Sequence, residues 1–388
     1  MSPSTASKHA CASSSTAASD AAAVTAAPPP GPQQPLRYAL AIHGGAGVIN
    51  SSNSVWIGSA MEGLQAALDA GHAVLRAGGS AVDAAVASVV VLENDPHFNA
   101  GVGSVLTASG QHELEASLMS SSGSACGAVT LLKQVANPIV LAKHVMEHTP
   151  HIFLSGPEAE QFAVQQGMQL VDNASFTTQQ RKEQWQRYAA EQRLAPADEI
   201  VQKIGGPADA AAAVAGPSAA AADGSKDHCQ TVGAVAIDSQ GRLAAATSTG
   251  GRTNKWDGRI GDTPMIGSGE TLISTWADTN CAVSGTGVGE EFIRRAAAHD
   301  VAARMQYKGL SLAAAMHEVV WQSMAEGDGG FVGVDSDCNC VMDFNSVGMY
   351  RAAVDYRGNC VLAVFPDEVQ QEEKQDDEQQ EKQEGHGK

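Results

Sequence analysis

The apolar positions in the first half of the chain follow two different periods. Residues 38–42 form a continuous apolar run, which is typical of a buried strand. Residues 61–75 place apolar side chains on one face at helical spacing. Ser80, with Asp83 three positions later, predicts the N-cap of a second helix that reaches about residue 91. A further strand and a further helix are expected over residues 118–132 and 138–146.

The second half of the chain begins and ends with strand patterns. Residues 231–237 and 243–249 predict two strands, and residues 239–241 predict the turn between them. Two helices and two strand regions are expected over residues 290–305, 310–324, 329–344 and 348–365. Because both halves contain strands and helices in separate blocks, the pattern predicts an α+β fold in which helices cover sheets.

Composition divides the 388 residues into ordered parts, a linker and two tails. Residues 1–36 are mostly Ser, Ala, Thr and Pro, and residues 367–388 carry nine acidic residues and three lysines. Both ends are expected to be disordered. Residues 205–227 are mostly Ala, Gly, Pro and Ser with few large apolar residues, which predicts a flexible linker over residues 205–230. We therefore expect two parts between the tails. The first covers residues 37–230 and ends in the flexible linker, and the second covers residues 231–366.

The net charge of −19 narrows the classes of partner. Neither nucleic acid nor an anionic membrane surface is expected, because the chain offers no basic face to neutralise phosphates. The apolar run at residues 84–92 is too short to span a membrane. Seven cysteines with irregular spacing fit free thiols in a reducing compartment, so we expect a cytoplasmic protein. Organelle import is the alternative, because residues 1–36 are rich in Ser and poor in acids, as transit peptides are.

One short motif resembles a metal site. His144, Glu147 and His148 form an H-x-x-E-H string, and on a helix the two histidines would share a face and bind zinc. The alternative is a polar helix face that ends before Pro150, since no third ligand can be identified. A Gly-rich stretch at residues 285–289 only partly matches a dinucleotide-binding loop, because its third Gly comes one place early.

The two strands that follow the linker place two threonines side by side. If Gly241 is left-handed in a three-residue loop, residues whose numbers sum to 480 face each other, so Thr231 pairs with Thr249. A plain cross-strand threonine pair is the simplest interpretation. Thr231 is, however, also the first ordered residue after the linker. A chain break before it would create an α-amine with a pKa near ~8, able to deprotonate its own hydroxyl.

Two charged residues downstream form a candidate clamp for a zwitterion. Arg259 and Asp262 lie three residues apart in a Gly-rich loop. A guanidinium binds an α-carboxylate and a carboxylate binds an α-ammonium, so the pair could hold a free amino acid. The alternative is a surface ion pair of little energetic value. Asn99 is most simply a turn residue.

Six segments stand in the same order as in a known family. They are residues 43–47 (HGGAG), 92–96 with 98–101 (LENDP and FNAG), 231–236 (TVGAVA), 246–251 (ATSTGG), 258–262 (GRIGD) and 344–351 (FNSVGMYR). On these segments the chain resembles the plant-type L-asparaginases, also called isoaspartyl peptidases, over roughly residues 38–365 apart from the linker. These are N-terminal nucleophile hydrolases, so the resemblance implies a four-layer αββα sandwich.

The resemblance also implies roles for particular residues. The precursor would cut itself between Gln230 and Thr231 into an α chain and a β chain that stay together. Thr231 would be the nucleophile and Thr249 its hydroxyl partner. Thr286 and Gly287 would form the oxyanion hole. The enzyme would release aspartate from β-aspartyl dipeptides and asparagine without a catalytic cofactor, and two αβ units would associate into a heterotetramer.

The same resemblance implies how substrate and ion are held. Arg259 and Asp262 would bind the α-carboxylate and the α-amine of the substrate, and Asn99 would lie near the scissile site. A structural sodium ion would be held mainly by carbonyl oxygens, which suit a hard cation. The residues of this loop are Leu92, Glu93, Asp95, Phe98, Ala100 and Val102.

Two departures from the family keep alternatives open. Gln230 stands where the family usually has Gly before the nucleophile, and a β-carbon penalises the strained backbone that Gly tolerates. A homologue that does not mature and serves as a binding protein is therefore one alternative. The segment that begins at Glu115 also differs from the family pattern. Two further alternatives are the zinc hydrolase and a protease similar to threonine aspartase, although a clamp for free amino and carboxyl groups argues against the protease.

Overall fold

The computed structural model describes residues 36–194, 231–266, 274–366 and 368. The predicted linker lies outside the described residues, as do the N-terminal extension except Leu36 and the acidic tail except Glu368.

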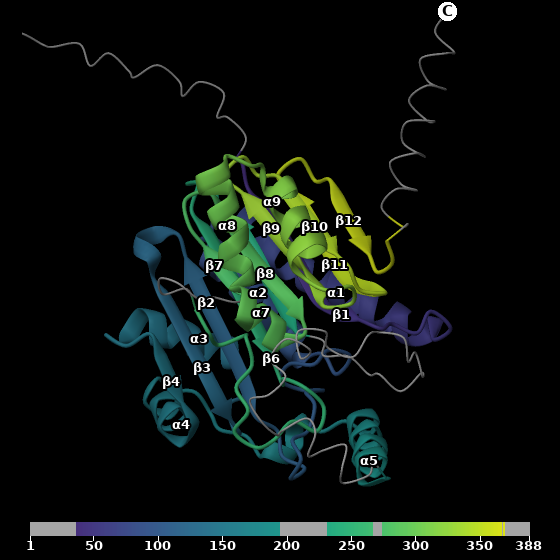
Figure 1. Cartoon of the computed structure of the whole chain (residues 1–388). Helices are drawn as coiled ribbons and strands as arrows, with labels where there is room; N and C mark the ends of the chain where they lie inside the picture. The colour runs from purple at the N-terminus through teal and green to yellow at the C-terminus, as the bar shows by residue number, and fades with distance from the viewer. Residues whose placement is uncertain (1–35, 195–230, 267–273, 367, 369–388) are drawn as a thin grey trace, which may run out of the picture. The chain divides into compact units, whose positions relative to one another are not determined.

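The larger sheet of the described chain has eight strands in the order β12-β11-β1-β5-β6-β2-β3-β4 (Figure 1). Its strands are β1 (Ala39–Gly47), β2 (Leu114–Ser120), β3 (Cys126–Leu132), β4 (Phe153–Ser155), β5 (Val232–Ile237), β6 (Leu243–Thr249), β11 (Gly348–Asp355) and β12 (Cys360–Ala363). All neighbours are antiparallel except β3 and β4. Strand β1 pairs with β5 on one side and β11 on the other, so the two ordered parts of the chain share one sheet.

A second, smaller sheet packs face to face on the first. Within the described residues it has the order β10-β9-β8-β7. Its strands are β7 (Thr275–Ala277), β8 (Cys281–Gly287), β9 (Gly329–Asp335) and β10 (Cys340–Phe344). Strands β1 and β5 contact β9 and β8 across the interface. Many of the buried side chains between the sheets are alanines, including Ala41, Ala245 and Ala282, which lets the two backbones lie close together at these positions.

Helices cover the outer face of each sheet. Helices α1 and α2 pack on the central strands of the larger sheet and α3 packs on β2 and β3, while α8 and α9 pack on the smaller sheet (Figure 1). The helices are α1 (Ser54–Arg76), α2 (Ala81–Asn94), α3 (Pro138–His148), α4 (Gly156–Gln165), α5 (Gln179–Leu194), α7 (Gly289–Arg295), α8 (Ala297–Lys308) and α9 (Leu312–Glu318). Each helix layer buries its own apolar cluster against its sheet. The layers therefore run helix, sheet, sheet, helix, which confirms the predicted αββα sandwich.

The local predictions around the second half's first hairpin are confirmed. The β5–β6 register pairs Val232 with Ser248 and Gly233 with Thr247, so each pair sums to 480. Gly241 has a φ of 74°, the left-handed conformation that the three-residue loop requires. The Ser80 side chain accepts a hydrogen bond from the Asp83 backbone N–H, which confirms the predicted N-cap.

Three segments that were predicted as single elements are interrupted or change helix type in the structure. The strand predicted over residues 118–132 is two strands, because a 3₁₀ turn with Gly123 at φ 64° reverses the chain. The helix predicted over residues 290–305 is divided where Ala296 is left-handed, at φ 50°. The helix predicted over residues 310–324 ends as a π-helix, Val319–Ser323. Helices α4 and α5 were not predicted.

Candidate active site

The two threonines of the hairpin meet as predicted. Thr231 directly precedes β5 and Thr249 ends β6, and both residues are buried. The Thr231 hydroxyl donates a hydrogen bond to the Thr249 hydroxyl, with the oxygens 3.2 Å apart. Thr249 Oγ1 also accepts from the backbone N–H of Gly251 at 3.0 Å. The Thr231 hydroxyl is thus fixed beside a second hydroxyl, as the sequence predicts. Gln230 lies outside the described residues.

A buried histidine holds the backbone of Thr231. His43 Nδ1 lies 2.9 Å from the Thr231 carbonyl oxygen, and its Nε2 lies 2.9 Å from Ser284 Oγ. Since a carbonyl oxygen only accepts, Nδ1 carries the proton and Nε2 accepts from the Ser284 hydroxyl. Burial lowers the pKa of His43 to about 3, so the ring is neutral. Sequence analysis did not assign this role, although His43 lies in one of the family segments.

The contact to His43 continues as a chain of hydroxyl groups between the two sheets. Ser284 Oγ lies 2.7 Å from Thr247 Oγ1, which accepts from Thr275 Oγ1 at 2.7 Å. Thr275 Oγ1 in turn lies 2.9 Å from Ser117 Oγ, whose hydroxyl also contacts the Thr263 carbonyl oxygen at 2.5 Å. A Cβ at Gly233 would overlap both Ser284 Oγ and His43 Nε2, so only Gly fits beside this chain. Buried networks of this kind rigidify a site when every member has a partner.

The predicted oxyanion-hole residues lie at the end of β8. The Thr286 hydroxyl accepts from the Ala46 backbone N–H at 3.2 Å, which joins it to the end of β1 next to β5. Gly287 has a φ of 153°, and a Cβ there would overlap the Asp328 carbonyl oxygen. This position therefore requires glycine.

The predicted clamp residues adjoin each other, but they do not form a surface ion pair. Asp262 is buried and accepts from the Ser274 hydroxyl. Arg259 instead pairs with Glu290, with Nη2 and Nε 2.9 and 3.1 Å from Oε1. A Cβ at Gly289 would overlap Asp262 Oδ1 and lie 3.0 Å from Arg259 Nη2, so both charged groups converge on this glycine. Burial is the main cause that raises the pKa of Asp262 to about 6.

Asn99 is more than a turn residue, because its side chain fixes the loop after β6. It is buried and donates to the Gly251 carbonyl oxygen at 2.7 Å. Its Oδ1 accepts from the Val105 N–H at 2.8 Å, and its carbonyl accepts from Gly250 N–H at 2.9 Å. Asn99 thereby holds the two glycines that follow Thr249.

Carbonyl oxygens in and beside the predicted sodium loop lie close to its two glycines. A Cβ at Gly101 would overlap the Glu93 carbonyl, and one at Gly103 would overlap the Pro96 carbonyl and lie 2.9 Å from that of Phe98. The Glu93 carboxylate points elsewhere and accepts from Ser248, Ile139 and Asn137. Main-chain oxygens are ligands that suit a hard cation such as the expected sodium ion, and the Glu93 carbonyl also accepts from the Val102 N–H at 2.8 Å.

The zinc motif gains no support from the geometry. His144 Nδ1 and His148 Nδ1 lie 3.2 Å apart on α3, while the Glu147 carboxylate lies 3.8 Å from Lys143 Nζ. Among the residues that the structure describes, no three His, Cys, Asp or Glu side chains are arranged to hold a metal ion.

A membrane-spanning helix needs a long apolar stretch, and none of the helices in the described residues has one.

Comparison with known proteins places these residues in context. The family model described as Asparaginase matches residues 36–362. The isoaspartyl peptidase of Escherichia coli is 42% identical over 317 residues, which are 81% of this chain and 91% of that protein. The isoaspartyl peptidase/L-asparaginase of Mus musculus is 38% identical over 320 residues, 81% of this chain and 87% of the mouse protein.

Proposed function

The chain belongs to the asparaginase family, and from this membership we propose that it is a hydrolase of β-aspartyl dipeptides and L-asparagine that releases L-aspartate. One observation carries the proposal. Thr231 follows an Ala- and Gly-rich segment in the sequence, and its hydroxyl lies 3.2 Å from that of Thr249. Cleavage between Gln230 and Thr231 would give this hydroxyl an α-amine on its own residue, which supplies the base that a threonine nucleophile needs.

The proposed reaction has two steps. Thr231 Oγ attacks the β-carbonyl of the substrate while the α-amine takes the hydroxyl proton and passes it to the departing amine. Ammonia leaves from asparagine, and an amino acid leaves from a dipeptide. Water then attacks the acyl-enzyme and releases aspartate. The Thr286 hydroxyl and the Gly287 N–H would stabilise the oxyanion in both steps, and removal of one such donor costs about 3–4 kcal/mol of transition-state stabilisation.

Substrate selection would follow from the charges of Arg259 and Asp262. A Cβ at Gly251, whose N–H donates to Thr249, would lie 3.3 Å from Arg259 Nη1. The guanidinium of Arg259 would bind the α-carboxylate, and the ionised carboxylate of Asp262 would bind the α-ammonium. Both groups adjoin Gly289, so they fit one free amino acid unit. A protease acting after aspartate inside a protein would have neither charge on its substrate, and this supports a small-molecule substrate.

Two parts of the proposal concern the assembly. Sodium would be held by main-chain oxygens of the loop whose residues are Leu92, Glu93, Asp95, Phe98, Ala100 and Val102, and it would supply fixed positive charge to that loop. Two αβ units would associate into a heterotetramer, as the family resemblance implies.

A denaturing gel with N-terminal sequencing tests the proposal. We expect two fragments, the second beginning at Thr231, together with release of aspartate. Thr231→Ala should stay uncut and inactive, whereas Arg259→Ala should be cut but bind substrate weakly. An intact chain that still releases aspartate would overturn the threonine nucleophile. An intact chain without aspartate release would favour the binding-protein alternative, for which the Gln230 side chain is the motivating feature.

A further inference from the structure

Two carboxylates hold the loop that carries Arg259. Glu113 Oε2 accepts from the Gly258 backbone N–H at 2.9 Å, and both Glu115 oxygens lie 3.1–3.2 Å from the Gly261 N–H. Gly258 and Gly261 flank Arg259 in the sequence. Glu113 directly precedes β2 and Glu115 lies near its start, and both carboxylates reach this loop. The loop is therefore fixed at two points around the guanidinium.

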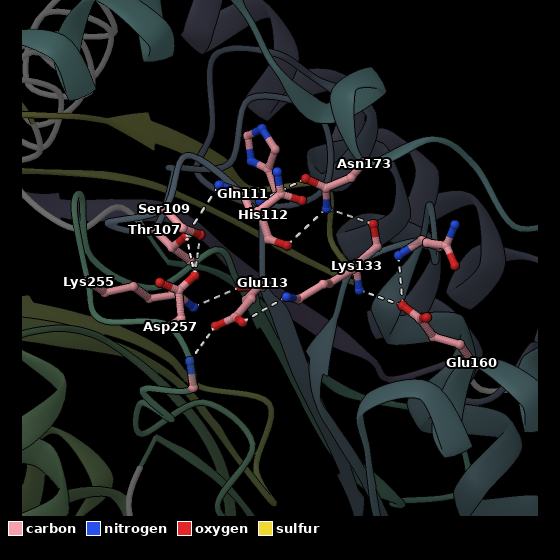
Figure 2. Close-up of polar contacts among 12 residues, drawn as sticks. Thr107, Ser109, Gln111, His112, Glu113, Lys133, Glu160, Asn173, Lys255 and Asp257 are labelled. Atoms are coloured by element: carbon pink, nitrogen blue, oxygen red, sulfur yellow. Dashed lines mark hydrogen bonds and ion pairs between the residues drawn. The ribbon is translucent and has the colours of Figure 1, made fainter.

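Each carboxylate is itself buried and held. The Glu113 side chain is 4% exposed, and its Oε1 lies 3.4 Å from Lys133 Nζ. Figure 2 draws this ion pair. Its carbonyl oxygen accepts from Lys255 Nζ at 2.8 Å. Glu115 accepts from the Thr130 hydroxyl at 3.1 Å. A buried carboxylate is costly without such partners, so both anchors are fixed in place.

The other side of the loop is docked as well. Asp257 Oδ1 accepts from the hydroxyls of Thr107 and Ser109 at 2.8 and 2.5 Å (Figure 2). The Ala108 N–H donates to the Lys255 carbonyl at 2.7 Å. Contacts on both sides of the turn that leads into Arg259 leave the loop little freedom to shift.

The Glu115 carboxylate also lies near the Arg259 guanidinium, beside Gly261. A Cβ at Gly261 would lie 2.8 Å from Arg259 Nη1 and 2.9 Å from Glu115 Oε1, so the two groups bracket this glycine. The negative charge of Glu115 contributes to the raised pKa of Asp262, and Arg259 opposes it. Glu290 faces the same guanidinium from α7.

We propose that Glu113 and Glu115 are positioning residues for substrate binding, which set the spacing between the Arg259 guanidinium and the Asp262 carboxylate. This spacing selects a substrate unit with a free α-carboxylate and a free α-ammonium. The inference rests on the proposed function, because it assumes that these two groups bind the substrate.

The test compares two variants of Glu115 with a matched control. Glu115→Asp keeps the charge but withdraws it by one methylene from the Gly261 N–H. We expect KM for asparagine and for a β-aspartyl dipeptide to rise about ten-fold or more, as for loss of a charged hydrogen bond, with kcat changed less than about three-fold and normal self-cleavage. Glu160→Asp is the control, because Glu160 also accepts from two backbone N–H groups, those of Lys133 and Gln134 (Figure 2). Neither residue belongs to the Arg259 loop, although Lys133 Nζ pairs with Glu113.

Glu115→Gln provides a second readout that a purely structural anchor would not move. The amide keeps an acceptor oxygen and the side-chain shape but removes the charge that faces Asp262. The Asp262 carboxylate must be ionised to bind an α-ammonium, so the acid limb of kcat/KM should move to lower pH in this variant. This variant keeps the proposal testable if Glu115→Asp does not fold.

The outcomes separate this inference from the proposed function. A wild-type protein that neither cuts itself nor releases aspartate would remove the proposed function. If wild type is active, an unchanged KM in Glu115→Asp, or an equal rise in Glu160→Asp, overturns the positioning role. An unmoved acid limb in Glu115→Gln overturns the electrostatic coupling to Asp262.

Discussion

Replacing His43 with Leu removes a donor and an acceptor from the centre of the molecule. The Thr231 carbonyl loses its contact at 2.9 Å, and the Ser284 hydroxyl loses its acceptor at 2.9 Å. An unsatisfied buried polar group costs about 1–3 kcal/mol, and Ser284 keeps Thr247 as a partner, so the two losses together should cost about 2–4 kcal/mol of unfolding free energy. The Thr231 backbone would also lose its fixed orientation, so self-cleavage should slow.

Urea unfolding followed by fluorescence measures the first effect, and a time course on denaturing gels measures the second. His43→Asn is the partial rescue, because its amide N–H can still donate to the Thr231 carbonyl. His72→Leu is a control, since His72 Nε2 has a contact with the Tyr38 hydroxyl at 3.1 Å, far along the chain from the threonines. A His43→Leu protein as stable as wild type and cut at the same rate would refute the reasoning.

The lowered pKa of His43 predicts how the stability of the folded protein changes with pH. Burial lowers the pKa of His43 to about 3, whereas the unfolded chain takes up this proton near pH 6.5. Between these values the unfolded state binds more protons, so stability is fully present above pH 6.5 and falls as pH drops toward 3. His43→Asn, which does not titrate, should lose less stability than wild type over this interval.

The remaining predictions concern one carboxylate and two glycines. Burial raises the pKa of Asp262 to about 6 from 3.8, so wild-type stability falls as pH rises between these values. Asp262→Asn should therefore be more stable than wild type at pH 8, by up to about 3 kcal/mol in urea unfolding, while losing aspartate release. Equal stability at pH 8 would contradict this. Gly101→Ala should destabilise by about 1–3 kcal/mol in the same assay, because the φ is 49° and a Cβ overlaps the Glu93 carbonyl. Gly58→Ala should stabilise by about 0.5–1 kcal/mol, because it lies exposed in α1 with open space around it.

The threonine pair could be predicted because its geometry is local. A hairpin with a three-residue loop fixes its own register, so the spacing from Thr231 to Thr249 was enough to place the two side chains together. The layered architecture was predicted from the family segments, since strand and helix patterns alone do not determine how sheets stack.

The groups that sequence reasoning missed are brought together over long separations. His43 and Ser284 are 241 residues apart and meet only because two sheets stack. The sequence pattern gives no sign of the hydroxyl network between the sheets, because its members Thr247, Thr275 and Ser117 are typical strand residues. Glu115 stood out only as a departure from the family pattern, although it anchors the Gly261 backbone. The left-handed break at Ala296 was missed because no glycine marks it.

The position of β1 between β5 and β11 has a consequence for how a cut enzyme would recover after denaturation. An intact chain refolds at a rate that does not depend on its concentration. Once the chain is divided before Thr231, the piece that carries β1 and the piece that carries both of its neighbours must first encounter each other. Refolding of the divided protein would then be faster at high protein concentration and would fail at high dilution. An uncut Thr231→Ala protein would refold at the same rate at both concentrations.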